Sequence, residues 1–263
     1  MIADFNDALE TVKKVLALDF ACQEKYFYED GTFVCEAREM PGRRRFPFRE
    51  KSLTAAAMGR GVVISCSAGR LGWAKANLSR LSRNEIFAAP AIALMEKYVN
   101  RDRQFIAGPD LKYICTPDSF YPFTIDKEIE IILVEDAKQL ELYNDKRFPN
   151  SLGYSNNPQR VAAIASCNGE IAGKAAASAD CDIMWQIGVD TLPAYRNRGI
   201  GKAMVSAVTE YILNRGIIPY YSTNPSNIAS GRITDSLGYR PTWVELYSRE
   251  LKPEVNVHAD YRD

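Results

Sequence analysis

The sequence has little that would build a histidine-based or metal-based site. Its single histidine, His258, lies in a polar stretch, so a Ser-His-Asp or Cys-His mechanism would require that stretch to fold back. A histidine-rich metal site is excluded. The six cysteines include no Cys-x-x-Cys pair, and a chain of 263 residues can bury a core without disulfides. We therefore predict reduced thiols and no metal cofactor.

The sequence also lacks long apolar runs and an excess of either charge. Charged residues interrupt every apolar stretch before the ~18 residues that suggest a membrane helix. Asp4, Asp7 and Glu10 give the start of the chain an acidic character, which is the reverse of the basic start of a signal peptide. Basic and acidic residues number 33 each, so no overall field attracts nucleic acid or an anionic membrane. We expect a cytoplasmic protein with neither partner, whose oligomeric state no motif specifies.

What the sequence does contain is the average composition of a globular protein, with 46% hydrophobic and 25% charged residues. The first twenty residues have apolar side chains at helical spacing, and 61–66 (GVVISC) is typical of a buried strand. Ser82 and Glu85 have the spacing of a capping box, which predicts a helix through Tyr98. Basic residues cluster between Arg43 and Lys51, where a solvated loop is favoured over an anion contact.

The second half of the chain predicts an antiparallel meander followed by helices. After a proline-rich and aromatic stretch at 115–123, strands are expected at 128–134, 161–166, 171–177 and 183–189, with Asn168-Gly169 forming a hairpin turn. An amphipathic helix begins near Ile200 and should end at Gly216. A strand at 217–222 is followed by Asn224-Pro225, which predicts a second helix to about Leu237.

The turn before the amphipathic helix has the chemistry of an anion site. It reads Arg196-Asn197-Arg198-Gly199-Ile200-Gly201-Lys202, with two glycines at a helix start, where free N–H groups and the helix dipole favour phosphate. It is neither a dinucleotide fingerprint nor a P-loop. As an isolated G-x-G, it is also compatible with a tight connection alone.

In its context, this turn resembles the Q/R-x-x-G-x-G/A motif of the GNAT superfamily of acyl-CoA-dependent N-acetyltransferases. Asn227 and Leu237-Gly238-Tyr239 lie at the spacing of that family, and the resemblance extends over 128–251. It implies an α+β fold, with a mixed and mostly antiparallel GNAT-type sheet flanked by helices. The N-terminal α/β region, residues 1–122, is then additional to a catalytic domain at 123–263. That region either supplies substrate walls or is a degenerate second copy of the fold.

The resemblance also implies where acetyl-CoA binds. The family holds the pyrophosphate on the backbone of the motif, here Arg198 to Lys202, with positive charge from Arg196, Arg198 and Lys202. A splayed or bulged strand, here Ile187-Gly188-Val189, pairs with the pantetheine arm. Gly188 fits a bulge or a packing glycine. Asn227 matches a residue that contacts the coenzyme arm, and capping of its own helix is the alternative.

The proton donor departs from the family pattern. Many members have a tyrosine seven residues after the asparagine, and this chain has Thr234 there. Tyr221 is the substitute that we favour, with Tyr220 second because neighbouring strand residues point to opposite faces. Either tyrosine can instead be a core aromatic. No general base is identified: Asp182 stands at the start of the third meander strand or in a turn, and water can also remove the proton.

These features predict an acetyl-CoA-dependent N-acetyltransferase that acts on a primary amine of a small molecule. The acceptor is not specified, because one fold serves many acceptors. The missing tyrosine leaves a non-catalytic acyl-CoA sensor as the alternative. Nucleic-acid binding through the basic cluster is a third reading, which the neutral charge disfavours.

Overall fold

The structure is a computed structural model that describes residues 4–46, 50–125, 128–143, 145–151, 157 and 159–251. Arg49 of the basic cluster and His258 lie outside these residues. Ten strands form a mixed sheet in the order β1-β3-β2-β10-β4-β9-β8-β7-β6-β5. The pairs β1–β3 and β8–β9 are parallel, and the other pairs of known direction are antiparallel. The predicted mixed, mostly antiparallel sheet flanked by helices is therefore confirmed.

The chain divides into two compact units, and β4 and β10 contribute to both. Unit 1 comprises residues 1–15, 41–47 and 111–242, and unit 2 comprises 16–40, 48–110 and 243–263. The chain begins with α1 (Phe5–Asp19), which shares its residues between the units. The shared strands are β4 (Gln104–Ile114) and β10 (Arg240–Glu250).

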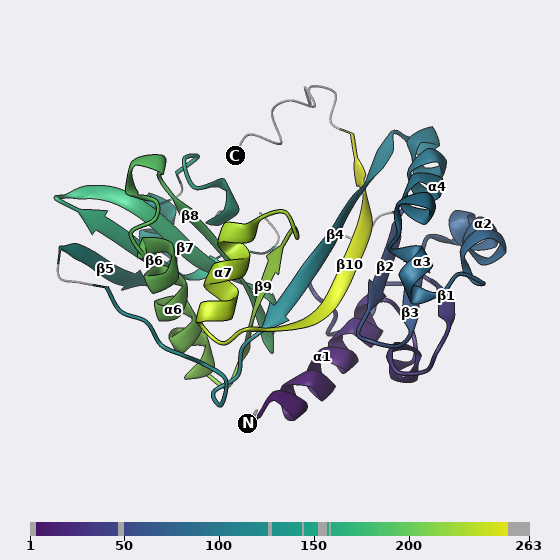
Figure 1. Ribbon diagram of the computed structural model, residues 1–263, viewed down its shortest axis with the longest axis horizontal. Helices are drawn as coiled ribbons and strands as arrows, with labels where there is room; N and C mark the ends of the chain where they lie inside the picture. The colour runs from purple at the N-terminus through teal and green to yellow at the C-terminus, as the bar shows by residue number, and fades with distance from the viewer. Residues whose placement is uncertain are drawn as a thin grey trace. The chain divides into compact units, whose positions relative to one another are not determined.

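Unit 1 contains the predicted meander and the two helices that follow it (Figure 1). Its other elements are β5 (Ile129–Val134), α5 (Ala137–Leu142), η3 (Pro149–Ser151), β6 (Gln159–Cys167), β7 (Glu170–Cys181), β8 (Met184–Thr191), η4 (Pro193–Tyr195), α6 (Ile200–Leu213), β9 (Ile218–Thr223) and α7 (Ile228–Ser236). Asn168 and Gly169 both have positive φ, as the predicted hairpin turn between β6 and β7 requires.

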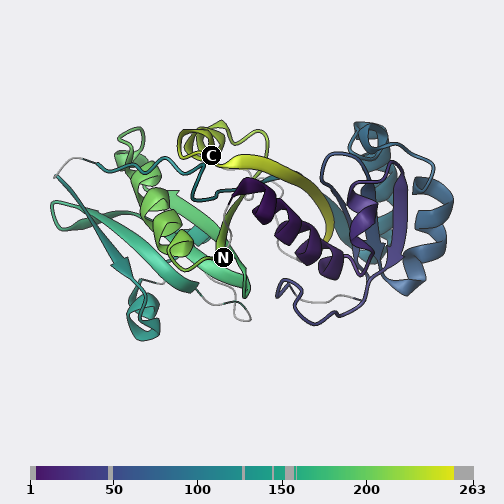
Figure 2. The same cartoon turned by 90° about the horizontal axis from the view of Figure 1, so that it is seen from below.

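The two faces of the unit 1 sheet have separate cores, and α6 and α5 lie on opposite sides of this sheet (Figure 2). Ala175, Ala177 and Ile187 pack with α6 in the larger core. Ala176, one residue out of phase, packs with Leu140 of α5 on the opposite face. Strand residues alternate between faces, so residue parity along β7, β8 and β9 decides which face a side chain joins.

Two predicted helix boundaries were wrong. The helix expected from Ser82 to Tyr98 is split into α3 (Arg83–Ile86) and α4 (Ala89–Val99), although the Ser82–Glu85 capping box is present. Pro90 lies in the first turn of α4, where its missing N–H is tolerated, whereas inside a continuous helix it would clash with the preceding turn. The second helix begins after Asn227 and not at Asn224, whose side chain accepts hydrogen bonds from Ser226.

Unit 2 has its own apolar core, to which α2 and α4 contribute Ala74, Leu78 and Met95. Its remaining elements are η1 (Glu24–Phe27), β1 (Thr32–Glu36), β2 (Leu53–Ala57), β3 (Val62–Cys66), α2 (Ala68–Leu78) and η2 (Asn100–Asp102). The strand expected at 61–66 is β3. Within the described part of the chain, no helix combines the length and apolar character that a membrane span requires.

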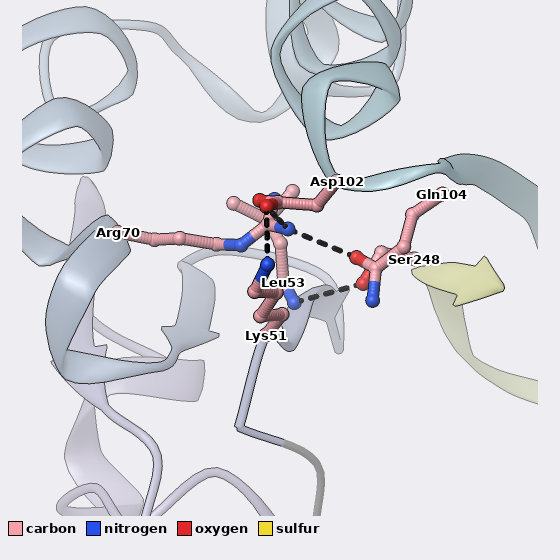
Figure 3. Close-up of polar contacts among 6 residues, drawn as sticks. All are labelled: Lys51, Leu53, Arg70, Asp102, Gln104 and Ser248. Atoms are coloured by element: carbon pink, nitrogen blue, oxygen red, sulfur yellow. Dashed lines mark hydrogen bonds and ion pairs between the residues drawn. The ribbon is translucent and has the colours of Figure 1, made fainter.

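A polar cluster in unit 2 accounts for one end of the basic stretch (Figure 3). Asp102 accepts from Lys51 Nζ at 2.6 Å and from Arg70 Nη2 at 2.9 Å. Arg70, only 4% exposed, also donates to Gln104 Oε1 at 3.0 Å and stacks over the Tyr98 ring. Lys51 thus belongs to an ion-pair cluster of unit 2, whereas Arg43 to Arg45 belong to unit 1.

Candidate functional site

The parallel strands β8 and β9 separate at the centre of unit 1. Their pairing runs from Met184 with Ile218 to Ile187 with Tyr221 and ends there. Beyond that point β8 stays paired with β7, while Ser222 and Thr223 of β9 stay paired with β4. The two strands therefore splay, as expected for Ile187 to Val189. The register of β7 with β8 is continuous across Gly188, so the alternative of a bulge at that glycine is wrong.

A cavity of about 330 Å³ lies at this splay. Five of the predicted site residues line it: Ile187, Gly188, Val189, Tyr221 and Asn227. The other lining residues are Pro149, Asn150, Ser151, Gln159, Ala176, Ser178, Gln186, Ser222, Thr223, Asn224 and Ser230. None of these sixteen described residues carries a charge.

The glycine turn ends at the start of α6, next to β8. Gly199 is the N-cap residue of α6 and has a left-handed φ of +79°. Because glycine has no side chain, nothing from this residue caps the first amides of the helix, which belong to Ile200, Gly201 and Lys202. A Cβ at Gly201 would lie 3.2 Å from Thr191 Oγ1 and 3.9 Å from Val189 Cγ2. The helix start therefore packs closely against the strand that lines the cavity.

The three basic side chains of the turn are placed around this helix start. Arg196 is exposed and donates from Nε to the Thr191 carbonyl at 3.2 Å. The exposed Arg198 lies over the Tyr195 ring, and Lys202 Nζ lies 4.2 Å from the centre of the Phe123 ring. Positive charge thus surrounds amides that no side chain caps, which is a favourable environment for phosphate.

Tyr221 is buried on the α6 face of β9, between the cavity and α7. Its hydroxyl hydrogen-bonds to Ser230, and its ring makes an edge contact with Tyr239. Burial raises the pKa of Tyr221 to about 12, although the Ser230 hydrogen bond lowers it in part. At neutral pH the hydroxyl is therefore protonated beside the cavity.

Tyr220 points to the opposite face and belongs to a buried polar cluster. Its hydroxyl contacts the carboxylate of Asp180 and lies 3.0 Å from Gln186 Oε1. Asp180 is 1% exposed and also accepts from Ser178 Oγ at 3.0 Å and from Asn157. Burial raises the pKa of Asp180, whereas these hydrogen bonds and the charge of Arg44 lower it.

The solvated-loop interpretation of the basic cluster is wrong for Arg44 and incomplete for Arg45. Arg44 is 3% exposed and lies over the rings of Phe46 and Tyr220. Arg45 donates to the Ala179 carbonyl at 2.9 Å and pairs with Asp182 at 2.5 Å. Asp182 is an exposed residue of the β7–β8 turn and does not line the cavity.

Asn227 and Thr234 have local partners in α7. Asn227 caps the helix by accepting from Ser230 N at 3.1 Å, and it also lines the cavity. Thr234 is fully buried and donates to the Gly231 carbonyl at 2.7 Å, with a further hydrogen bond to Tyr113. The structure does not bring Thr234 to the cavity wall.

The segment 145–151 forms a wall of the cavity against β8. Asp190 accepts from Asn150 Nδ2 at 2.7 Å and from Ser151 N at 3.0 Å. Gly188 is needed here because a Cβ would lie 1.9 Å from the Asn150 carbonyl oxygen. Beneath this wall Lys174 is fully buried and donates to Tyr143 O and Gln159 Oε1.

Sequence reasoning missed the polar residues behind the cavity, above all Asp180 and Lys174. Asp180 lies at the end of β7, and Lys174 is a single charge within an apolar strand. An isolated charge at a strand position that alternation places in the interior is the signal that could have identified Lys174. Among the described residues, no three His, Cys, Asp or Glu side chains gather where a metal could bind.

Comparison with known proteins identifies the region that carries this site. Residues 135–243 match the sequence model of the GNAT acetyltransferase family. No curated protein matches the chain. Among solved structures, similarity is found to a GCN5-related N-acetyltransferase from Kribbella flavida, with 19% identity and a TM-score of 0.47 over 60% of this chain and 65% of that one.

A GCN5-related N-acetyltransferase-like protein from Streptococcus suis is 16% identical, with a TM-score of 0.45 over 59% of this chain and 66% of that one. An aminoglycoside N-acetyltransferase in complex with CoA is 20% identical, with a TM-score of 0.33 over 43% of this chain and 89% of that one. The match spans slightly less than two thirds of the first two structures. Residues 135–243 of this chain are therefore similar to the GNAT acetyltransferases, which are acyltransferases.

Proposed function

We propose that the protein transfers an acetyl group from acetyl-CoA to a primary amine of a small molecule. The observation that carries this proposal is the cavity at the splay of β8 and β9, which is open beside Ile187 and Tyr221 where pairing ends. Separated strands leave main-chain groups that an amide-containing ligand can pair with. Val189, which lines the cavity, also lies next to the helix start at Gly201.

The residues at the start of α6 fit a pyrophosphate. Gly199 and Gly201 leave the backbone uncovered, and a Cβ at Gly201 would crowd Thr191 and Ile233, at 3.2 and 3.4 Å. The amides of Ile200, Gly201 and Lys202 would hold the phosphate oxygens, and Arg196, Arg198 and Lys202 would neutralise their charge. Bound here, acetyl-CoA supplies the thioester whose C–S bond breaks as the amine nitrogen forms the new C–N bond.

The edge of β8 from Ile187 to Val189 would orient the pantetheine arm through main-chain hydrogen bonds. Asn227 lines the same cavity and also serves as the N-cap of α7. Its amide Nδ2 is a donor that the cap does not use, since capping employs only Oδ1. We assign this donor to the coenzyme arm.

Tyr221 is our proton donor for the departing thiolate. Its hydroxyl lies at the cavity and carries its proton at neutral pH, because burial raises its pKa to about 12. Tyr220 is directed into the Asp180 cluster on the other face, and Thr234 hydrogen-bonds within its own helix. Neither of these two hydroxyls is a direct partner for a group in the cavity.

Two measurements on the purified full chain test this function. Calorimetry should detect acetyl-CoA binding, and a thiol reagent should detect CoA release when a panel of primary amines is added. If acetyl-CoA binds but no amine of the panel causes CoA release, the non-catalytic sensor is favoured instead. Absence of binding by a folded protein would overturn the proposed function altogether.

A further inference from the structure

The wall of the cavity on the α5 face of the sheet has a defined pattern of neutral polar groups. Ser178, Gln186 and Ser222 share the strand parity of Ala176, which packs on that face, and all three line the cavity. Ser178 pairs in register with Gln186, and Gln186 with Tyr220. Asn150 extends this wall from the segment that Asp190 holds. If Tyr221, on the opposite face, serves the coenzyme, this wall is left for the acceptor.

Three of these wall residues, Ser178, Asn150 and Ser222, hydrogen-bond to a charged side chain behind them, which takes up part of their hydrogen-bonding capacity. The Ser178 hydroxyl donates to Asp180, and Asn150 Nδ2 donates to Asp190. A serine hydroxyl has one hydrogen, so Ser178 retains only acceptor capacity, whereas the Asn150 amide retains its carbonyl oxygen and one N–H. Ser178 therefore accepts hydrogen bonds, and Asn150 can accept them through its carbonyl oxygen, with a carboxylate behind each, so both positions suit the N–H groups of an amine.

Ser222 presents a hydrogen-bond donor to the cavity. Lys112 is 6% exposed and donates from Nζ to Ser222 Oγ at 2.6 Å. Because an ammonium can only donate, the Ser222 hydroxyl hydrogen remains available for an acceptor on a ligand. The acceptor at Ser178 and the donor at Ser222 lie on one wall, since these residues belong to the strands on either side of β8. A ligand that satisfies both carries an amine and, a short distance away, a hydroxyl or similar oxygen.

The absence of charge among the described lining residues restricts the ligand further. A second ammonium or a carboxylate on the acceptor would enter a cavity where no described side chain pairs with it, which is costly. Hydroxyl groups are matched instead by the amides and hydroxyls of the wall. We infer that the acceptor is a primary amine with neighbouring hydroxyl groups and no further charge, of the amino-sugar or amino-alcohol class. This inference rests on the proposed function.

The test compares amines that differ in hydroxyl content or charge, two of which share the same cyclohexane frame. Glucosamine and trans-2-aminocyclohexanol represent the inferred class, cyclohexylamine lacks the hydroxyl, and spermidine and glutamate add charge. CoA release from acetyl-CoA gives kcat/KM for each, expressed per neutral amine. We expect the hydroxylated amines to exceed cyclohexylamine by about tenfold or more, which is the effect of one good hydrogen bond.

Two wall variants give different signatures. Ser222→Ala should reduce the ratio of 2-aminocyclohexanol to cyclohexylamine by several-fold, because it removes the donor that serves the hydroxyl. Ser178→Ala should lower kcat/KM for both amines and leave their ratio unchanged, because it acts on the amine common to both. Ser236→Ala is the matched control, since Ser236 is exposed on α7, does not line the cavity and hydrogen-bonds to Ile233 O within its own helix.

The outcomes separate this inference from the function on which it rests. If calorimetry shows acetyl-CoA binding and spermidine, glutamate or cyclohexylamine is the better acceptor, the inferred class is wrong while acetyl transfer stands. A ratio that Ser222→Ala leaves unchanged, or no turnover with either hydroxylated amine, also overturns the inference. If acetyl-CoA does not bind, the proposed function fails, and the inference fails with it.

Discussion

The two faces of the sheet at the splay meet the same cavity with different chemistry. On the α6 face, Tyr221 presents a protonated hydroxyl among apolar neighbours such as Ile187 and Val189. On the α5 face, neutral wall residues cover the buried charges of Asp180 and Lys174 and the half-buried charge of Asp190. Adjacent tyrosines of β9 fall on either side of this division. A single step of strand parity thus separates a group that can act on a ligand from one that stabilises a buried carboxylate.

The largest expected effect tests that division directly. Tyr221→Phe should lower kcat by about 10²–10⁴-fold, the usual effect of losing a general acid, while acetyl-CoA affinity changes little. Because the pKa of Tyr221 is raised to about 12, its protonated form should not be depleted below about pH 10. Steady-state kinetics and calorimetry on the same preparation measure both quantities.

Tyr220→Phe and Thr234→Ala are the matched controls for that variant. Tyr220→Phe removes a hydroxyl that contacts the buried Asp180 carboxylate, so we expect about 1–3 kcal/mol of lost stability and a smaller loss of kcat. Thr234→Ala removes a bond to the carbonyl of Gly231 within α7, and kcat should be nearly unchanged. A normal kcat for Tyr221→Phe beside a large loss for Thr234→Ala would reverse the assignment.

The next largest effect concerns the start of α6. Gly201→Val should weaken acetyl-CoA binding by about 10–100-fold, because the added side chain crowds Thr191 and displaces amides that serve the phosphate. Gly72→Val is the control, since Gly72 is also helical and a Cβ there meets nothing within 4 Å. Calorimetry that shows equal affinity in both folded variants would place the pyrophosphate elsewhere.

A smaller effect tests the buried charges of the α5 face. Burial lowers the pKa of Lys174 from 10.5 to about 8, while nearby Asp145 and Asp190 raise it in part. Between these values the unfolded chain binds more protons than the folded one, so the contribution of Lys174 to stability rises with pH. From pH 7 to pH 9.5, wild type should gain about 1–2 kcal/mol relative to Lys174→Met.

Urea unfolding of both proteins at the two pH values measures this difference. Loss of the hydrogen bonds to Tyr143 and Gln159 affects the variant at each pH and cancels in the comparison. A constant gap between the two proteins would mean that Lys174 has an ordinary pKa and that the α5 face carries no strongly desolvated cation.

Local sequence patterns were sufficient to predict much of the secondary structure of unit 1. Asn168-Gly169 fixed the hairpin, and helical spacing from Ile200 placed α6 before the left-handed Gly216. The prediction failed where several residues compete for one role. Asn224, Ser226 and Asn227 can all cap a helix, and packing rather than propensity selects Asn227. β4 was not predicted at all, because its position depends on pairing with the distant strand β9.

Some residues of the candidate site could likewise be predicted from local sequence patterns, and others could not. The glycine turn, the splayed strand and Tyr221 could be named from sequence because motif spacing and strand parity are local properties. Asp180, Asn150 and Ser222 could not, because their roles come from partners 40, 40 and 110 residues away along the chain. Segment 43–46 likewise acquires its role only by packing against the end of β7.

The smallest effect separates two roles of Asn227, on the α6 side of the cavity. Asn227→Ala should cost about 1 kcal/mol of stability through loss of the cap. Asp136→Ala removes the equivalent cap of α5, away from the cavity, and should cost a similar amount without changing acetyl-CoA affinity. Asn227→Ser keeps a capping oxygen but loses the amide donor, so stability should be retained while affinity falls a few-fold. Chemical unfolding and calorimetry provide the two readouts. If Asn227→Ser binds acetyl-CoA as tightly as wild type, then Asn227 is a helix cap alone, and the coenzyme arm relies on the main chain of β8.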